Sequence, residues 1–138
     1  MVLKNHRIIL DTNIWISYLI TKNHSLLDDL LINQQITILF SEELLNEFFE
    51  VINRPKLKKY FKHKDLEVIL EIIENYGELI EVKSKIEICR DYKDNFLLSL
   101  AVDGKANYLI SGDADLLVLK KIKKTKIISI KEFYLTFN

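Results

Sequence analysis

Acidic residues follow two short apolar runs of the sequence. Asp11 comes directly after Arg7–Leu10, and Asp113 and Asp115 come shortly after Asn107–Ile110. Short apolar or β-branched runs of this kind predict strands buried on both faces. Because ligands of an open parallel sheet bind outside the carboxyl ends of its strands, we expect these acids to lie together at one sheet edge.

Two further acids stand near the starts of predicted helices. Ser41 is a good N-cap, and Glu47 lies on the edge of the apolar stripe of the helix that follows it. Asp94 opens a later helix. Right-handed connections between the strands would bring both helix starts to the same sheet edge. The expected cluster is Asp11, Glu47, Asp94 and Asp113, with Asp115 nearby.

Clustered carboxylates indicate a cation, since like charges raise one another's pKa unless something compensates them. Oxygen ligands favour Mg²⁺ or Mn²⁺ over zinc, and His6, His24 and His63 show no metal-ligand spacing. One or two such ions lower the pKa of a water and stabilise the leaving oxygen of an in-line displacement. The pattern therefore predicts phosphodiester hydrolysis.

Each acid also has an ordinary interpretation. Asp11, Asp94 and Asp113 are all suitable N-caps for the helices that follow them, and Glu47 could pair with a neighbour such as Arg54. Independent caps have no reason to gather at one sheet edge. The predicted convergence is what favours a functional site.

The elements that must position these acids alternate between strand and helix patterns. We predict a three-layer α/β/α sandwich with a five-stranded parallel sheet, forming one domain over residues 1–138. The predicted strands are Arg7–Leu10, Ile36–Phe40, Leu79–Val82, Asn107–Ile110 and Lys126–Ser129. The predicted helices include a stripe from Leu44 to Ile52 that ends before Pro55, a stripe from Leu66 to Ile73 that closes near Gly77, and Asp94–Lys105. Shorter helical candidates are Ile14–Ile20, Leu26–Ile32 and Glu132–Phe137.

Composition excludes several classes. The 3 glycines are too scattered for a glycine-rich phosphate loop. A single cysteine, Cys89, cannot form an internal disulfide and fits a reducing cytoplasm. No apolar run approaches the roughly 18 residues of a membrane helix, so we expect a cytoplasmic protein without a membrane partner. The formal net charge of +0 argues at first sight against nucleic acid. However, acids gathered in a metal site would leave basic stretches elsewhere.

The acids and their neighbours resemble those of a PIN domain, and more narrowly the VapC-like toxins of bacterial and archaeal toxin–antitoxin pairs. The resemblance runs from Arg7 to about Ile130. The segments that carry it are Asp11-Thr12-Asn13, Ser41 with Glu47, Asn53-Arg54-Pro55-Lys56-Leu57, Asp94-Asn95, and Ser111-Gly112-Asp113-Ala114-Asp115-Leu116-Leu117. Departures are small: Ser111 stands where threonine is common, and Tyr92-Lys93 where proline is frequent.

The resemblance implies a Mg²⁺- or Mn²⁺-dependent endoribonuclease that cuts single-stranded RNA. It implies the strand order 3-2-1-4-5, frequent homodimers and an antitoxin protein as partner. The implied catalytic and metal-binding acids are Asp11, Glu47, Asp94 and Asp113, with Asp115 as an accessory acid and Thr12, Asn13 and Ser111 as polar supports. The choice of Glu47 over Glu43 rests only on its spacing from Ser41.

Two basic stretches are candidates for substrate contact. The first contains Tyr60 and Phe61 and offers Arg54, Lys56, Lys58, Lys59 and Lys62. Single-strand binders combine a basic groove with aromatic faces, so we predict RNA contact by this stretch. The second follows the Asp113 loop closely and contains Lys120, Lys121, Lys123, Lys124 and Lys126. Lysine runs are also commonly no more than a solvated surface.

The alternative to a nuclease is a non-catalytic acidic-pocket binding module, either receiver-like or an inactive PIN-like scaffold. A receiver needs adjacent acids after its first strand, but Asp11 stands between Leu10 and Thr12. The intact set of four acids argues against a scaffold that has lost catalysis.

Overall fold

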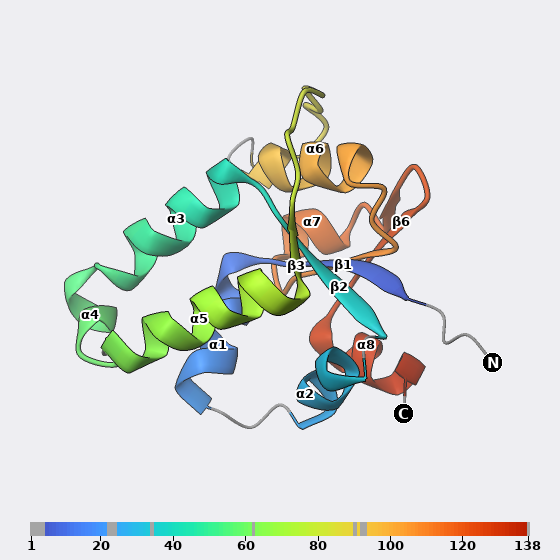
Figure 1. Cartoon of the computed structure of the whole chain (residues 1–138). Helices are drawn as coiled ribbons and strands as arrows, with labels where there is room; N and C mark the ends of the chain where they lie inside the picture. The colour runs from blue at the N-terminus through green and yellow to red at the C-terminus, as the bar shows by residue number, and fades with distance from the viewer. Residues whose placement is uncertain are drawn as a thin grey trace.

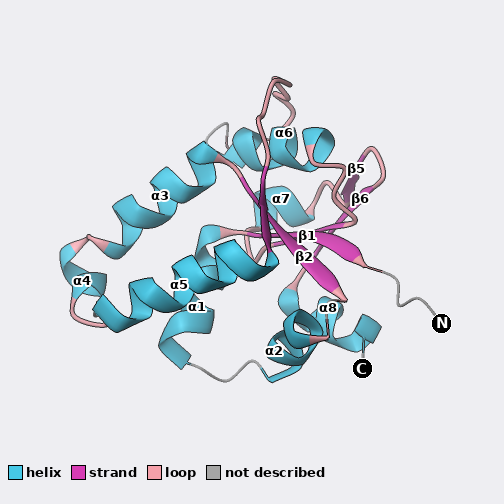
Figure 2. Cartoon of the chain, viewed as in Figure 1, coloured by secondary structure: helices cyan, strands magenta, loops and turns pink. Residues whose placement is uncertain are grey.

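A central sheet of six strands runs through the protein, with helices on both sides of it (Figure 2). The computed structural model describes residues 5–21, 25–33, 35–61, 63–89, 91 and 94–137. The strand order is β3-β2-β1-β4-β6-β5, and every neighbouring pair is parallel except β5 with β6. The strands are β1 (His6–Leu10), β2 (Ile36–Phe40), β3 (Gly77–Leu79), β4 (Tyr108–Ile110), β5 (Lys121–Ile122) and β6 (Thr125–Ile128).

The five predicted strands are present, and their predicted order is confirmed with β6 as the fifth. The prediction of only five strands is wrong, because the two-residue strand β5 adds an antiparallel edge beside β6. Its lysine-rich sequence lacks the apolar run used to find the others. The third strand begins at Gly77 rather than at Leu79. Its last partner in β2 is Phe40, so the chain beyond Leu79 leaves the sheet.

The helices lie around the sheet in groups (Figure 1). In this view α3, α4 and α5 lie to the left, α6 and α7 above the sheet, and α2 and α8 below it. Pro55 begins α4 directly after the α3 turn, as its fixed φ allows at a first helical position. The helices are α1 (Thr12–Thr21), α2 (Ser25–Ile32), α3 (Glu42–Ile52), α4 (Pro55–Lys58), α5 (His63–Tyr76), α6 (Asn95–Asp103), α7 (Ala114–Leu117) and α8 (Ile130–Phe137).

The core forms on both faces of the central strands. Ile8, Ile9 and Leu10 of β1 are fully buried, as are both apolar residues Leu109 and Ile110 at the end of β4. This confirms that the apolar runs predict strands covered on both sides. The rigid centre of the sheet therefore ends where Asp11 and Ser111 begin.

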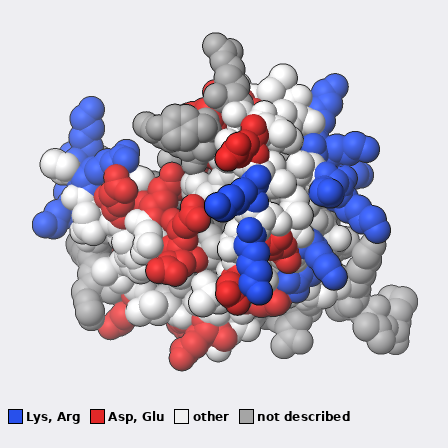
Figure 3. Space-filling view, turned by 90° about the horizontal axis from the view of Figure 1, so that it is seen from above, with Lys and Arg blue, Asp and Glu red and all other residues white. Residues whose placement is uncertain are grey.

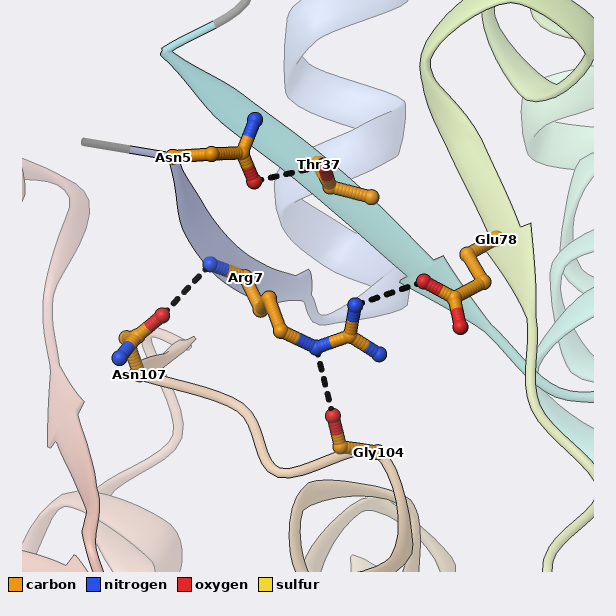
Figure 4. A network of polar contacts seen from close by, with 6 residues as sticks. All are labelled: Asn5, Arg7, Thr37, Glu78, Gly104 and Asn107. Atoms are coloured by element: carbon orange, nitrogen blue, oxygen red, sulfur yellow. Dashed lines mark hydrogen bonds and ion pairs between the residues drawn. The ribbon is translucent and has the colours of Figure 1, made fainter. Parts of the chain in front are cut away.

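A polar network ties the opposite edge of the sheet, where the strands start (Figure 4). The Arg7 side chain donates from Nε to the Gly104 carbonyl at 2.8 Å and from Nη1 to the Glu78 carboxylate at 2.6 Å. The Arg7 backbone N–H donates to the Asn107 side chain at 2.7 Å. One side chain thus connects β1 to β3 and to the loop before β4.

No helix in the described ranges combines the length and the apolar character needed to cross a bilayer.

Candidate active site

The carboxylate of Asp11 is fixed where β1 and β4 end side by side. The Asp11 N–H donates to the Ile110 carbonyl at 3.0 Å. Ser111 Oγ donates to Asp11 Oδ2 at 2.7 Å and accepts from the Asp113 N–H at 3.0 Å. Ser111 is fully buried and Asp11 is only 7% exposed. Ser111 therefore connects the two acidic strand ends through one hydroxyl.

Burial is the main influence on Asp11 and raises the pKa of its carboxyl. Hydrogen bonds from Ser111 and from the backbone N–H of Thr12 lower this pKa, whereas the charge of Asp113 raises it. Asp11 thus contacts the first turn of α1, as a cap would. It is also a buried anion that faces a second anion, which a cap does not require.

Glu47 on α3 reaches the same place from another direction. The buried Thr12 hydroxyl donates to Glu47 Oε2. Burial raises the pKa of Glu47, the Thr12 hydrogen bond lowers it, and the charge of Asp11 raises it. Glu43 is exposed and lines a separate groove beside α6. The structure therefore brings Glu47, and not Glu43, to Asp11.

Asp94 precedes α6 and faces Asp113. Its side chain makes no capping hydrogen bond, so the cap interpretation of Asp94 is wrong. Asp94 Oδ2 is buried with no hydrogen-bond partner among the described residues. Burial, followed by the Asp113 carboxyl and the charges of Asp11 and Asp91, raises the pKa of Asp94 to about 7. The two carboxyls can hydrogen-bond to each other only when one of them holds a proton.

Asp113 does act as a cap, in addition to facing Asp94. Its Oδ1 accepts from the Asp115 N–H at 2.8 Å at the start of α7. Asp115 is half-buried, whereas Asn13 on α1 is exposed. The four predicted acids therefore act on one another electrostatically at one sheet edge, with Asp115 beside them.

The geometry of the acids is open rather than closed around a point. Within the described ranges, no three His, Cys, Asp or Glu side chains are grouped tightly enough to hold an ion directly between them. Among these acids, Asp94 and Asp113 face each other, and both act electrostatically with the buried Asp11. An orphaned buried oxygen in such a pair is chemically suited to a hard cation.

The first basic stretch begins close to Glu47. Arg54 forms an ion pair with Glu50 at 3.6 Å and also lowers the pKa of Glu47. Lys56 and Lys58 lie on α4, and Lys59 Nζ lies 5.1 Å from the centre of the exposed Tyr60 ring. Lys62 lies outside the described residues.

Sequence reasoning missed three side chains of α6 that hold the segment leading to Asp94. Asn95 Oδ1 accepts from the Cys89 N–H at 2.9 Å, and Ser99 Oγ accepts from the Ile86 N–H at 3.0 Å. Asp103 Oδ2 accepts from the N–H groups of Lys83 and Ser84 at 2.6 and 2.8 Å. Chain segment 83–89 therefore runs antiparallel to α6.

The signal for this arrangement was the spacing of the three acceptors. Asn95, Ser99 and Asp103 are four residues apart, which places them on one face of a helix. The same segment reaches the Asp113 loop, because Cys89 Sγ donates to the Asp115 carbonyl at 3.6 Å. Thus α6 positions both Asp94 and the chain that precedes it.

We expect Asp103→Ala to free the segment from the C-terminal end of α6. Hydrogen bonds to charged groups contribute about 1.5–3 kcal/mol, so amide exchange at Lys83 and Ser84 should accelerate by about tenfold or more. Hydrogen–deuterium exchange measures this, with the exposed Asp29→Ala as the matched control. Unchanged exchange at both amides would show that the Asp103 bonds do not hold the segment.

The structure is thus an α/β/α fold that carries a cluster of acidic side chains at the sheet edge where β1 and β4 end. The sequence model of the PIN domain family matches residues 7–115. The chain belongs to the PIN domain family.

Two individual proteins resemble the chain. It is 31% identical over 121 residues to the uncharacterized protein MJ1680 of Methanocaldococcus jannaschii, covering 86% of this chain and 77% of that protein. The fold is similar to a chain in the crystal structure of VapBC2 from Rickettsia felis bound to a promoter DNA fragment, with a TM-score of 0.55 and 20% identity. That likeness covers 88% of this chain and 96% of the other.

Proposed function

We propose that the protein is a metal-dependent endoribonuclease that hydrolyses single-stranded RNA, and that it is the toxin of a type II toxin–antitoxin pair. The observation that carries the proposal is the facing pair of Asp94 and Asp113 beside the buried Asp11. Asp113 also caps α7 and Asp11 contacts the first turn of α1, but these roles do not require three carboxyl groups to act on one another at one sheet edge. Carboxyl groups whose pKa values are raised by burial and by neighbouring acids are typical of functional sites.

The donor set supports a hard divalent cation. Asp94 Oδ2 is a buried oxygen without a partner in the described structure, and Asp113 faces it. We assign Asp11, Glu47, Asp94 and Asp113 as the residues that would hold Mg²⁺ or Mn²⁺, with Asp115 as an accessory. When bound, the metal supplies positive charge that lowers the pKa of a water and stabilises the leaving oxygen.

The polar neighbours orient these acids. Ser111 donates to Asp11, and Thr12 donates to Glu47, so each carboxylate is held in one orientation before substrate arrives. Asn13 is exposed on the first turn of α1 and is assigned to the solvent side of the site.

We assign RNA contact near the cut to Arg54, Lys56, Lys58, Lys59 and Lys62. Arg54 is 61% exposed at its side chain and acts electrostatically on Glu47, which supports a phosphate contact next to the acids. The exposed Tyr60 beside Lys59 offers a ring face for an unstacked base.

The partners are proposed on the family and the fold. The similarity of the fold to a chain of the VapBC2 complex supports the proposal that this protein also has an antitoxin partner. We further propose a cytoplasmic homodimer. Light scattering of the purified protein, alone and with the product of a small adjacent gene, tests both assemblies.

The test of the activity is cleavage of end-labelled single-stranded RNA by purified protein. We expect cleavage with Mg²⁺ or Mn²⁺ and none after EDTA, with duplex RNA of the same sequence cut more slowly. Activity that persists in EDTA would exclude the proposed mechanism.

Metal binding is testable without any substrate. We expect calorimetry to detect Mn²⁺ binding to the wild type and a loss of affinity of about tenfold or more in Asp113→Asn, because one ligand charge is removed. The exposed Asp29→Asn should bind Mn²⁺ as the wild type does. The absence of Mn²⁺ binding by the wild type would favour the inactive scaffold.

A further inference from the structure

The second lysine stretch lies next to the end of α6. Thr125 Oγ1 donates to the Ala106 carbonyl at 2.7 Å, and the Lys126 N–H donates to the Asn107 carbonyl at 3.0 Å. These bonds place the β5–β6 hairpin against the loop after α6. We call this surface the lysine face, and its members, all exposed, are Lys105, Lys120, Lys121, Lys123, Lys124 and Lys126.

The lysine face is not neutralised by acids. Chain segment 119–129 contains no Asp or Glu, and none of the six lysines forms an ion pair within the described part of the chain. Figure 3 shows Lys and Arg side chains gathered at the right-hand end of the molecule, the side on which the hairpin lies in Figure 1. The zero net charge of the chain thus conceals a strongly basic end.

Three of these lysines hold a backbone conformation that suits other residues better. Lys105, Lys120 and Lys123 have φ values of 51°, 64° and 52°, and they are the only non-glycine residues with positive φ in the described ranges. Glycine or asparagine occupies this left-handed region more easily. At each position a long cation therefore stands where local stability favours a small residue.

The hairpin also pairs two like charges. In the register of β5 with β6, Lys121 lies directly opposite Lys126. Like charges in this cross-strand position destabilise a hairpin. Strained backbone and paired like charges at one surface indicate that the positive charge serves something other than folding.

We propose that the lysine face binds the phosphate backbone of single-stranded RNA outside the catalytic site, independently of sequence. That RNA is the ligand rests on the proposed function. The hairpin offers no aromatic residue for base stacking, so its contacts are with phosphates. The hairpin follows α7 directly along the chain, and the Lys120 N–H donates to the Leu117 carbonyl at 3.1 Å at the end of this helix. Asp113 caps the start of α7, so one short helix connects the acidic site to the hairpin.

One other role of such lysines is to shield an edge strand from pairing with another molecule. β5 is the last strand of the sheet, so this role is physically reasonable. It differs from the proposal in its consequences: losing the shield would cause aggregation, and RNA affinity would not change.

The test is salt-dependent binding of a fluorescent single-stranded RNA in EDTA, where cleavage is absent. The face variant carries Lys121→Gln, Lys124→Gln and Lys126→Gln. The control variant carries Lys83→Gln, Lys85→Gln and Lys131→Gln, three exposed lysines outside the lysine face with the same loss of charge. Fluorescence anisotropy over about 50–300 mM NaCl gives the slope of log Kd against log salt concentration, which is ~0.7 per phosphate contact for single strands.

We expect the slope of the face variant to fall by about 2, and its affinity at low salt to fall by about tenfold or more, with the control close to wild type. Its melting temperature should not fall, since the Lys121–Lys126 repulsion is gone. Equal slopes for face variant and wild type, or aggregation with unchanged RNA affinity, would overturn the proposal. A wild type that never cleaves RNA but shows the expected slope change would refute the proposed activity alone.

Discussion

Asp11→Asn abolishes RNA cleavage and leaves the fold intact, if the acidic edge is the catalytic site. Asparagine keeps the size of the side chain and an oxygen that can accept from Ser111, so we expect the 2.7 Å hydrogen bond between the residues that follow β1 and β4 to remain. What disappears is the buried negative charge. We expect a rate loss of about a thousandfold or more, which corresponds to about 4 kcal/mol of transition-state stabilisation.

The control for this prediction is Asp29→Asn, which removes one exposed carboxylate on α2. Circular dichroism and melting of both variants separate loss of chemistry from loss of structure. Because Asp11 is buried beside other anions, the metal-free Asp11→Asn protein should melt no lower than wild type. Cleavage by Asp11→Asn at the wild-type rate, with contaminating nuclease removed, would refute the assignment.

The fold could be predicted where burial dictates sequence. Every side chain of Ile8–Leu10 is buried, so the run is continuously apolar and visible without a structure. β5 escapes this logic because it is an exposed edge with a lysine-rich sequence. The start of β3 was also missed. The strand begins at Gly77, where only glycine fits, because a Cβ on this residue would lie 2.7 Å from the Ile73 carbonyl oxygen. A sequence pattern does not show this contact.

The acids could be predicted for a different reason. Asp11 follows β1 directly and Asp113 follows β4 after only Ser111 and Gly112, so topology alone places both acids at one edge. The sequence could not show that Asp94 Oδ2 is buried without a partner, because this depends on how α6 packs. The four-residue spacing of Asn95, Ser99 and Asp103 predicts only that they share one face of a helix. Their partners are backbone N–H groups, and the sequence pattern does not show where those groups lie.

Local stability and the proposed activity conflict most strongly at Asp94. Burial and the facing Asp113 make ionisation of Asp94 unfavourable, while a cation would require it. The free energy of unfolding of the metal-free protein should therefore depend on pH through this carboxyl. This dependence distinguishes an electrostatically strained site from a set of ordinary helix caps.

We expect metal-free wild type to lose stability as pH rises from about 4 to about 7, and Asp94→Asn to lose less. The folded pKa of Asp94 is about 7, whereas an unfolded Asp has a pKa of about 3.9. Between these values the folded state binds more protons, so the free energy of unfolding falls with rising pH and the effect levels off above pH 7. Because Asp94 is only partly buried, we expect this carboxyl to change the free energy of unfolding by about 1 kcal/mol, which corresponds to roughly 4 °C in melting temperature.

Asp94→Asn should therefore melt close to wild type near pH 4 and above it at pH 8, with RNA cleavage lost. The control Asp29→Asn should follow the wild-type curve. Adding Mn²⁺ at pH 8 should raise the melting temperature of the wild type and leave that of Asp94→Asn almost unchanged, since the metal stabilises only the form that binds it. Parallel melting curves for wild type and Asp94→Asn across this pH range would show that the Asp94 carboxyl is not held against its ionisation. The pairing of Asp94 with Asp113 would then no longer support a cation site.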